Sequence, residues 1–543
     1  MKNIEKEQIM ANKNLFKKLL CAAAALTMAF SAVACGENNN NSSSGGGKRE
    51  NVTKIVIYTG GSSEYSWVEG SEEADVIDYI EEKYHEDTGV WLDFKVSHLS
   101  ESMRTKLNSD LSSGTQVDIA ISHTRGGSGI DDYVSAQELY YDITDDIDEF
   151  APNLAKYIKG SPRDSLTSAD GALVGIPSVI SPYKYGILVR KDWMEACGFT
   201  DDAQKAASGN YTLVNDLQDF KAMCAAMKER YNLSYAISGA PWDLEKVMIG
   251  AFGDAGYFSY GERAGKVVPG YLTDEYADIL DYEYSLSSND LTSTQEGDWL
   301  LEQAETAFIG GNTGVFIVDP TVQHLITVAR KTKEADKNAE FTVLGALTKD
   351  ETSTKKGFMV NTEATFAAVV LKSSKNSMAI AKFLNWVYKN ADNYNLCKYG
   401  VEGKHWVNNG DGTYSYPDGK EEYLVKKPYS GILALVENQN ISNLTYKGYT
   451  AEELSWIAAA ADKSNYVEND LITYMWPTNK SIANAYSNAI GKMYSFSALP
   501  AWNGTQDPKT TYADAKNQYL SSGGQTYVDF ITDAYKTMKA KRG

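Results

Sequence analysis

Aromatic side chains stand beside polar ones at several positions that the hydropathy pattern assigns to loops. Flat aromatic rings stack on the C–H faces of a ring-shaped solute, while carboxylate, amide and guanidinium groups bind its hydroxyls. This chemistry is noncovalent recognition, and an oligosaccharide is a suitable ligand for it. Trp242 and Tyr183 are the strongest candidates. The full set of expected contact residues is Tyr65, Trp67, Arg125, Tyr183, Tyr185, Trp242, Asp243, Asp319, His405, Trp406 and Trp476.

Short motifs that mark common active sites are missing from the sequence. We find no HExxH, no phosphate-binding loop ending in GK[ST], no GxSxG and no dinucleotide fingerprint that opens a helix. No cofactor is therefore expected, and the protein is not expected to be an enzyme. The 72 acidic residues still leave carboxylate pairs open, so an extracellular polysaccharide-degrading hydrolase stays an alternative.

The histidines and cysteines also lack metal-ligand spacing. The three cysteines after Cys35 include no CxxC pair, so neither a disulfide framework nor a cysteine metal site is expected. The segment 409–414 resembles a calcium loop, but the glutamate of the twelfth position is out of register. We therefore interpret Asp411-Gly412 as a hairpin turn and expect no metal.

Residues 12–35 have the features of a bacterial export signal. Three lysines precede an apolar run of about a dozen residues, which is too short to span a bilayer, and small residues then lead to Cys35. The segment resembles a lipoprotein signal, although Ala32 stands where leucine is usual. We therefore expect residues 1–34 to be removed as a signal peptide and Cys35 to carry lipid. The polar residues 35–51 are expected to form a flexible tether.

Size and charge limit the domains and partners. A chain of 543 residues with 43% hydrophobic content is long enough for at least two domains with their own cores. A net charge of -20 excludes nucleic acid as a partner, because phosphate contacts need a basic face. Arg125 and Lys184 would suit an acidic sugar, although solvated loop charges are the simpler interpretation.

The first folded part of the chain alternates between strands and helices. Apolar runs predict strands over 54–58, 91–96 and 117–121, and helical periodicity predicts helices over 74–85 and 103–111. This alternation indicates a parallel sheet with crossover helices. Ligands of such sheets bind beyond the carboxyl ends of the strands, so the loops after the first and third strands are candidate binding loops.

The stretch 170–198 is predicted to join two compact bodies. A short apolar run stops at Pro177, which cannot donate to a sheet ladder, and a second strand follows over 185–189. The pattern is similar to the hinge-crossing segment "dGklyGiP…yRkDw…G" of family 1 extracellular solute-binding proteins of ABC importers. The matching residues are Gly171, Gly175, Ile176, Pro177, Arg190, Lys191, Asp192, Trp193 and Gly198.

This resemblance implies an α/β, two-lobe, periplasmic-binding-protein-like (type II) fold with a hinge and an inter-lobe ligand cleft. One lobe would take residues 52–178 and about 322–375. The other lobe would take residues 179–321 and about 376–543. Further family-like segments follow in the family's order over most of residues 52–543.

The same resemblance implies a lipid-anchored protein that captures a small-molecule solute, with an oligosaccharide expected, by hinge closure. It would deliver the solute to the transmembrane subunits of an ABC permease. A monomer is expected at the outer face of the cell membrane of a Gram-positive bacterium. A binding protein of the same fold for peptides or another organic solute stays a further alternative, because fold does not fix the ligand.

Overall fold

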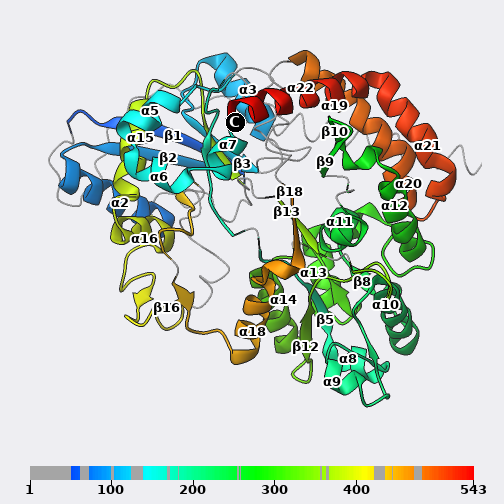
Figure 1. Cartoon of the computed structure of the whole chain (residues 1–543). Coiled ribbons are helices and arrows are strands. Elements are labelled where there is room, and N and C mark those ends of the chain that lie inside the picture. The colour runs from blue at the N-terminus through cyan, green and yellow to red at the C-terminus, as the bar shows by residue number, and fades with distance from the viewer. Residues whose placement is uncertain are drawn as a thin grey trace, which may run out of the picture. The chain divides into compact units, whose positions relative to one another are not determined.

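Two separate β-sheets organise the folded chain in the computed structural model (Figure 1). The large apolar cores form around different sheets, which is how a two-lobe α/β protein is built. The structure describes residues 50–60, 72–99, 103–123, 139–167, 171–181, 183–253, 256, 259–318, 320–354, 357–361, 366–420, 435–442, 444–469 and 480–542.

The first sheet has the strand order β2-β1-β3-β14-β4. β1 pairs in parallel with β2 and with β3, as the alternation of strands and helices predicts, whereas β14 runs antiparallel to β3 and β4. Ile55, Ile57 and Ile119 are fully buried within this lobe's core. The strands are β1 (Thr53–Gly60), β2 (Leu92–Leu99), β3 (Ile119–His123), β4 (Ile176–Pro177) and β14 (Phe366–Val370).

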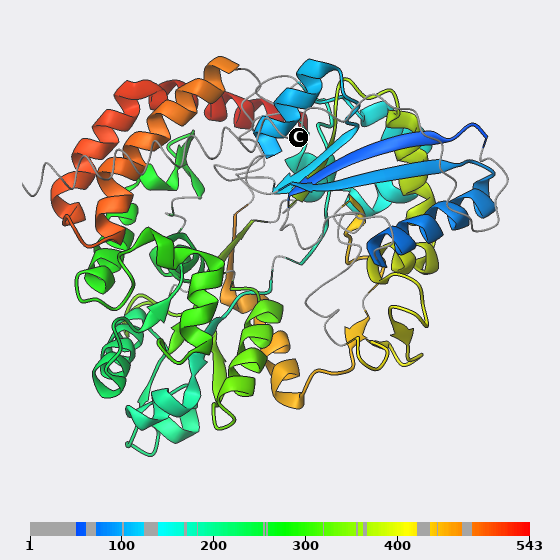
Figure 2. The ribbon, with the colours of Figure 1, turned by 180° about the vertical axis from the view of Figure 1, so that it is seen from behind.

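Helices from two distant parts of the sequence pack against this sheet (Figure 2). Phe383 of α15 packs on Phe94 of β2 with ring centroids 4.8 Å apart, which joins the later helices to the first strands. The helices of this lobe are α2 (Glu72–Thr88), α3 (Met103–Ser113), α5 (Thr144–Phe150), α6 (Pro152–Ile158), α7 (Ser161–Ser165), α15 (Ser377–Val387) and α16 (Ala391–Tyr399).

The second sheet has the strand order β12-β5-β11-β8. β5 is antiparallel to β12 and β11, and β11 is parallel to β8. The chain leaves the first sheet when β4 ends at Pro177, and it enters the second sheet with β5, so the predicted crossing near Pro177 is confirmed. The strands are β5 (Ile187–Arg190), β8 (Ile237–Ser238), β11 (Val315–Phe316) and β12 (Phe341–Leu344).

Helices of the second lobe pack on both cores that surround this sheet. Asp216 caps the longest of them, α10, since its carboxylate accepts the N–H groups of Gln218 and Asp219. The helices are α8 (Lys191–Ala196), α9 (Ala203–Ala206), α10 (Leu217–Tyr231), α11 (Pro241–Met248), α12 (Asp274–Ser287), α13 (Leu301–Ile309), α14 (Val322–Ala335) and α18 (Ala451–Ala460).

Sheet pairing corrects part of the expected division between the lobes. The range 322–375 was expected in the first lobe, yet α14 packs with β5 and β12 pairs with it. The range 376–543 was expected in the second lobe, yet α15 and α16 lie in the core of the first sheet. Apolar periodicity identifies a buried face, but it does not say which of two cores receives that face.

Helices at the C-terminal end of the chain extend the second core. Met493, Trp502 and Tyr519 are buried together with residues of α11 and α12. The hairpin β9 (Tyr260–Arg263) and β10 (Lys266–Pro269) packs against the last helix. These helices are α19 (Lys480–Met493), α20 (Leu499–Trp502), α21 (Pro508–Tyr519) and α22 (Gln525–Arg542).

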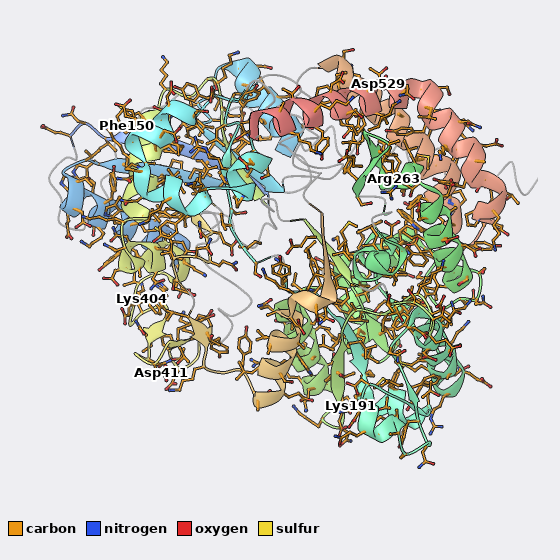
Figure 3. All side chains as sticks on the ribbon, in the orientation of Figure 1. Phe150, Lys191, Arg263, Lys404, Asp411 and Asp529 are labelled. Carbon is orange, nitrogen blue, oxygen red and sulfur yellow. The ribbon has the colours of Figure 1, made fainter. Side chains whose placement is uncertain are left out.

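Three small sheets complete the described fold. The predicted turn at Asp411 is confirmed, because β15 and β16 form an antiparallel pair around it and its carboxylate accepts the N–H of Thr413 (Figure 3). Within the described part of the chain, no helix combines the length and apolarity that crossing a membrane requires. The strands are β6 (Phe199–Thr200), β7 (Thr212–Leu213), β13 (Phe358–Asn361), β15 (Val407–Asn408), β16 (Thr413–Ser415), β17 (Thr445–Tyr446) and β18 (Tyr466–Asn469).

Candidate functional site

The structure describes only part of the predicted set of contact residues. Tyr183, Tyr185, Trp242, Asp243, His405 and Trp406 can be placed, and they fall in three different environments. The remaining predicted positions lie outside the described residues and are Cys35, Tyr65, Trp67, Arg125, Asp319 and Trp476.

The side chains of His405 and Trp406 pack in the interior of the molecule. Both side chains are buried, and the Trp406 indole donates to the carbonyl of Gly400 over 2.9 Å. Nδ1 of His405 accepts the N–H of Val401 over 3.0 Å, which also places that nitrogen inside the turn. Both side chains take part in packing here, and their expected contact with a ligand stays a prediction.

Tyr183 and Tyr185 lie in the segment that connects the two sheets. The Tyr183 hydroxyl donates to the carboxylate of Glu468 in β18, and the Lys463 ammonium lies 4.7 Å from the centroid of the Tyr183 ring. The backbone N–H of Tyr185 donates to the hydroxyl of Tyr466 over 2.9 Å. Burial, and then the Glu468 carboxylate, raise the pKa of Tyr183 to about 12, so its hydroxyl keeps its proton at neutral pH.

A second connection runs beside these tyrosines. β13 pairs in parallel with β18, and β13 leads along the chain toward β14 of the first sheet. β13 also contacts the short helix η2 (Ile249–Phe252) that follows α11, where the N–H of Gly250 donates to the carbonyl of Gly357 over 2.9 Å. A Cβ at Gly250 would lie 2.1 Å from that carbonyl oxygen, so only glycine permits this approach.

Trp242 stands at the carboxyl end of the second sheet. β8 ends at Ser238, and α11 starts at Pro241, which suits the first helical position because its missing N–H needs no partner there. The sequence had assigned residues 240–243 to a loop, but proline here begins the helix. Trp242 thus lies in the first turn of a helix at the strand end where α/β sheets commonly bind ligands.

Buried tryptophans hold the ring of Trp242 in place. Trp242 packs edge to face against Trp299, with centroids 5.9 Å apart, and against Trp502, with centroids 6.1 Å apart. Trp299 and Trp502 are only 2% and 3% exposed, whereas Trp242 is half-buried. Edge-to-face contacts with rigid neighbours fix a ring's orientation, so Trp242 forms a preorganised platform with one part left accessible.

Carboxyl groups support this cluster from within the lobe. Asp243 is buried, and its Oδ1 lies 2.8 Å from the Lys246 ammonium. The Glu283 carboxylate accepts the indole N–H of Trp502 over 2.7 Å through Oε2, while its Oε1 has no hydrogen-bond partner among the described residues. Burial, and then the negative charge of Glu245, raise the pKa of Glu283 well above its ordinary value of 4.5.

A small cavity with room for about one water molecule adjoins the cluster. Glu283 and Trp502 line it on one side, and the turn between β8 and α11 lines it on the other. A Cβ at Gly239 in this turn would lie 2.2 Å from the Ile317 side chain, so glycine lets β8 pass directly into α11. The cavity belongs to the support of Trp242 and is too small for a sugar ring.

Several residues of these two regions were not found from the sequence. Trp299, Trp502 and Glu283 come from distant segments, and only the fold brings them to Trp242. Tyr466 and Glu468 reach the crossing tyrosines in the same way. Aromatic residues beside polar ones could be recognised in the sequence, but the sequence could not show which aromatic rings contact one another.

Metal and thiol chemistry add nothing to these two regions. Among the residues that the structure describes, no group of three or more His, Cys, Asp or Glu side chains could hold a metal ion. The cysteines of the described chain, Cys197, Cys224 and Cys397, are free thiols, and burial raises the pKa of Cys224 and of Cys397.

Comparison by sequence finds distant relatives. No family model matches the chain. The polygalacturonan/rhamnogalacturonan-binding protein YtcQ of Bacillus subtilis (strain 168) is 22% identical over 312 residues, which cover 55% of this chain and 58% of YtcQ. The chain thus matches less than two thirds of that relative's length. Lipoprotein LipO of the same organism is 21% identical over 438 residues, or 72% of this chain and 77% of LipO.

Comparison by structure covers nearly all of the chain. An "HMO binding" solute-binding protein associated with an ABC transporter, from Bifidobacterium longum infantis, is 14% identical with a TM-score of 0.63, over 90% of this chain and 99% of that one. The alginate-binding protein AlgQ2 is 14% identical with a TM-score of 0.65, over 90% and 98%. The N-glycan transport protein NgtS of Streptococcus pneumoniae is 14% identical with a TM-score of 0.60, over 90% and 100%. The predicted fold class is confirmed: this chain has the two-lobe α/β fold of solute-binding proteins.

Proposed function

We propose that this protein is the substrate-binding component of an ABC importer and that it binds an oligosaccharide. The observation that carries the proposal is the accessible Trp242 ring, fixed by two buried tryptophans at the carboxyl end of a sheet in a solute-binding-protein fold. A sugar ring has an apolar C–H face that such a platform can cover. The relatives named for glycan or polysaccharide binding support this ligand class.

Two regions would have different roles in binding. Trp242 would stack on a sugar ring, and polar groups around it would accept hydrogen bonds from hydroxyls. The connecting segments with Tyr183, Tyr466 and Glu468 would change their backbone angles when the lobes close on the ligand. Closure stabilised by ligand contacts to both lobes would then present the loaded form to the permease.

The proposal includes binding without turnover. The solute-binding proteins of similar structure act with transporters, and the aromatic platform described above suits recognition. The predicted contacts outside the described residues, namely Tyr65, Trp67, Arg125, Asp319 and Trp476, would add to the same ligand site.

We further propose that Cys35 carries lipid and tethers a monomer to the outer face of a Gram-positive cell membrane, next to the permease subunits. The similarity to a protein named lipoprotein LipO supports the anchor. Metabolic labelling with a palmitate analogue tests it: wild-type protein should be labelled and membrane-bound, whereas Cys35→Ala should be unlabelled. A labelled Cys35→Ala variant would disprove the assignment.

A thermal-shift screen tests the binding function. Purified protein without residues 1–35 is heated with a panel of oligosaccharides, peptides and other organic solutes, and a ligand present at 100 times its Kd should add about 2.7 kcal/mol of stability. Each positive sugar is then recovered and analysed by mass. Recovery of unchanged sugar supports the proposal, shortened products would indicate a hydrolase, and stabilisation by peptides alone would assign another solute class.

A further inference from the structure

Three of the elements around the Trp242 ring supply carboxyl side chains, whereas α20, which supplies Trp502, supplies none. α11 supplies Asp243 and Glu245, α12 supplies Glu283, and the short helix η4 (Glu296–Trp299), which carries Trp299, supplies Glu296 and Asp298. The ring contacts between Trp242, Trp299 and Trp502 connect these elements directly. Asp243, Glu245 and Glu283 are buried, so the carboxyl groups that remain on the surface are Glu296 and Asp298.

The cation on the same helix as Trp242 is already paired. Lys246 lies on the same face of α11 as Trp242, one helical turn further along, and its ammonium pairs with Asp243 at 2.8 Å. This pair contributes no net charge. Burial, and then the charge of Glu245, raise the pKa of Glu283 well above 4.5, so Glu283 is not counted among the charges that a ligand would meet.

Two of the carboxyl groups are accessible to a ligand. Glu296 is exposed and Asp298 is half-buried, and Asp298 accepts the hydroxyl of Ser293 over 2.6 Å through only one of its oxygens. Tyr494, which packs on Trp502 with centroids 5.8 Å apart, also feels the charge of Glu296, since burial and then Glu296 raise its pKa. Carboxylates accept hydrogen bonds and donate none, so they suit sugar hydroxyls and repel a second carboxylate.

We infer that the ligand that stacks on Trp242 is a neutral oligosaccharide and that oligosaccharides with uronic acid at this position are rejected. The inference rests on the proposed function and narrows it to one class of sugar. The hydroxyls of a neutral sugar ring would donate hydrogen bonds to Glu296 and Asp298. A uronate would instead bring a second negative charge close to these carboxylates. The discrimination arises from electrostatic repulsion and so decreases as salt increases.

The test compares matched ligands. Neutral oligosaccharides of glucose, mannose, galactose, xylose and N-acetylglucosamine, together with oligogalacturonates and alginate oligomers of equal length, are screened at low salt by thermal shift and then by calorimetry. The best neutral ligand is next oxidised at C6 to its uronate. We expect the uronate to bind at least about 10-fold more weakly, and we expect the difference to shrink at 0.5 M salt.

A charge variant sharpens the result. Glu296→Gln should recover part of the affinity for the oxidised ligand, while Glu86→Gln, an exposed residue of α2 in the first lobe, should leave the ratio of the two affinities unchanged. Equal or tighter binding of uronates would overturn the inference and leave the proposed function standing. If no oligosaccharide of either class binds, the proposed function fails, and this inference fails with it.

Discussion

The segments that connect the lobes and the cluster around Trp242 both use aromatic residues, but they use them differently. In the connecting segments, Tyr183 and Tyr466 hold neighbouring strands through hydroxyl groups, and the Glu468 partner is exposed to water. Around Trp242, by contrast, the supporting rings are buried and meet edge to face. The connecting segments add hydroxyl hydrogen bonds near water to their ring contacts, whereas the cluster around Trp242 is held mainly by the packing of buried rings.

This difference separates two tasks within one mechanism. Hydrogen bonds near water exchange at small net cost, so segments held by them can change conformation. Packed aromatic rings lose many contacts if they move, so they keep a binding surface in one shape. Substitutions around Trp242 should therefore change folding stability, its pH dependence and ligand affinity. Substitutions in the connecting segments should change the coupling between the lobes.

Trp502→Ala should have the largest effect. It removes a buried indole and leaves Glu283 without its donor, so we expect a loss of about 3–5 kcal/mol in the free energy of unfolding. Urea denaturation measures this loss. Tyr79→Ala on α2, where the ring is 45% exposed, is the control and should change stability by about 0.5 kcal/mol or less. Equal effects of the two would disprove the packing role of Trp502.

Trp242→Ala should reduce affinity more than stability. Losing the stacking platform should raise the Kd for the identified sugar at least 10-fold, about 1.4 kcal/mol, as measured by calorimetry. The ring is half-buried, so its removal should destabilise the fold less than Trp502→Ala. An unchanged Kd would mean that the sugar binds elsewhere.

Glu283→Gln should change how stability depends on pH. The folded protein holds the Glu283 proton above the ordinary pKa of 4.5, at which the unfolded chain releases it. The stability from this group is therefore complete below about pH 4.5 and decreases as pH rises toward the folded pKa. Glutamine does not titrate and can still accept from Trp502, so the variant should be more stable than wild type at pH 8 by at least about 1 kcal/mol.

The comparison at pH 4.5 is the internal control for Glu283→Gln, because the folded wild-type protein holds its proton there and the two chains should differ least in melting temperature. Melting curves at pH 4.5, 6 and 8 give the result. A constant difference across this range would show that Glu283 is ionised in the folded protein.

Tyr183→Phe should have the smallest effect. It removes the hydroxyl that bonds Glu468 and keeps the ring, so we expect a loss of about 0.5–1.5 kcal/mol in stability. The Kd for the sugar should change by less than about threefold. If affinity instead falls as far as in Trp242→Ala, the connecting segments bind the ligand directly.

Local sequence patterns predicted the structural features that depend on residues close together in the sequence. The parallel strands of the first sheet, the turn at Asp411 and the crossing near Pro177 all follow from apolar periodicity and from proline and glycine chemistry. Trp242 was also singled out from its polar surroundings. Its helical position was missed because Pro241 was interpreted as part of a loop.

Long-range packing could not be predicted in the same way. Trp299 and Trp502 join Trp242 from segments about 60 and 260 positions away, and no local pattern connects them. His405 and Trp406 have the composition of a binding loop, yet their hydrogen bonds close a buried turn. The lobe that receives α14 or α15 likewise depends on which core their apolar faces meet.

The contact between Gly250 and Gly357 links the two regions compared above. The helix that begins at Pro241 with Trp242 runs into Gly250, whose backbone touches the residue just before β13. No side chain lies between them to absorb a displacement. A displacement of this helix at Trp242 would therefore move the backbone of Gly357 directly. Gly357 precedes β13, the strand that leads along the chain toward β14 of the other lobe.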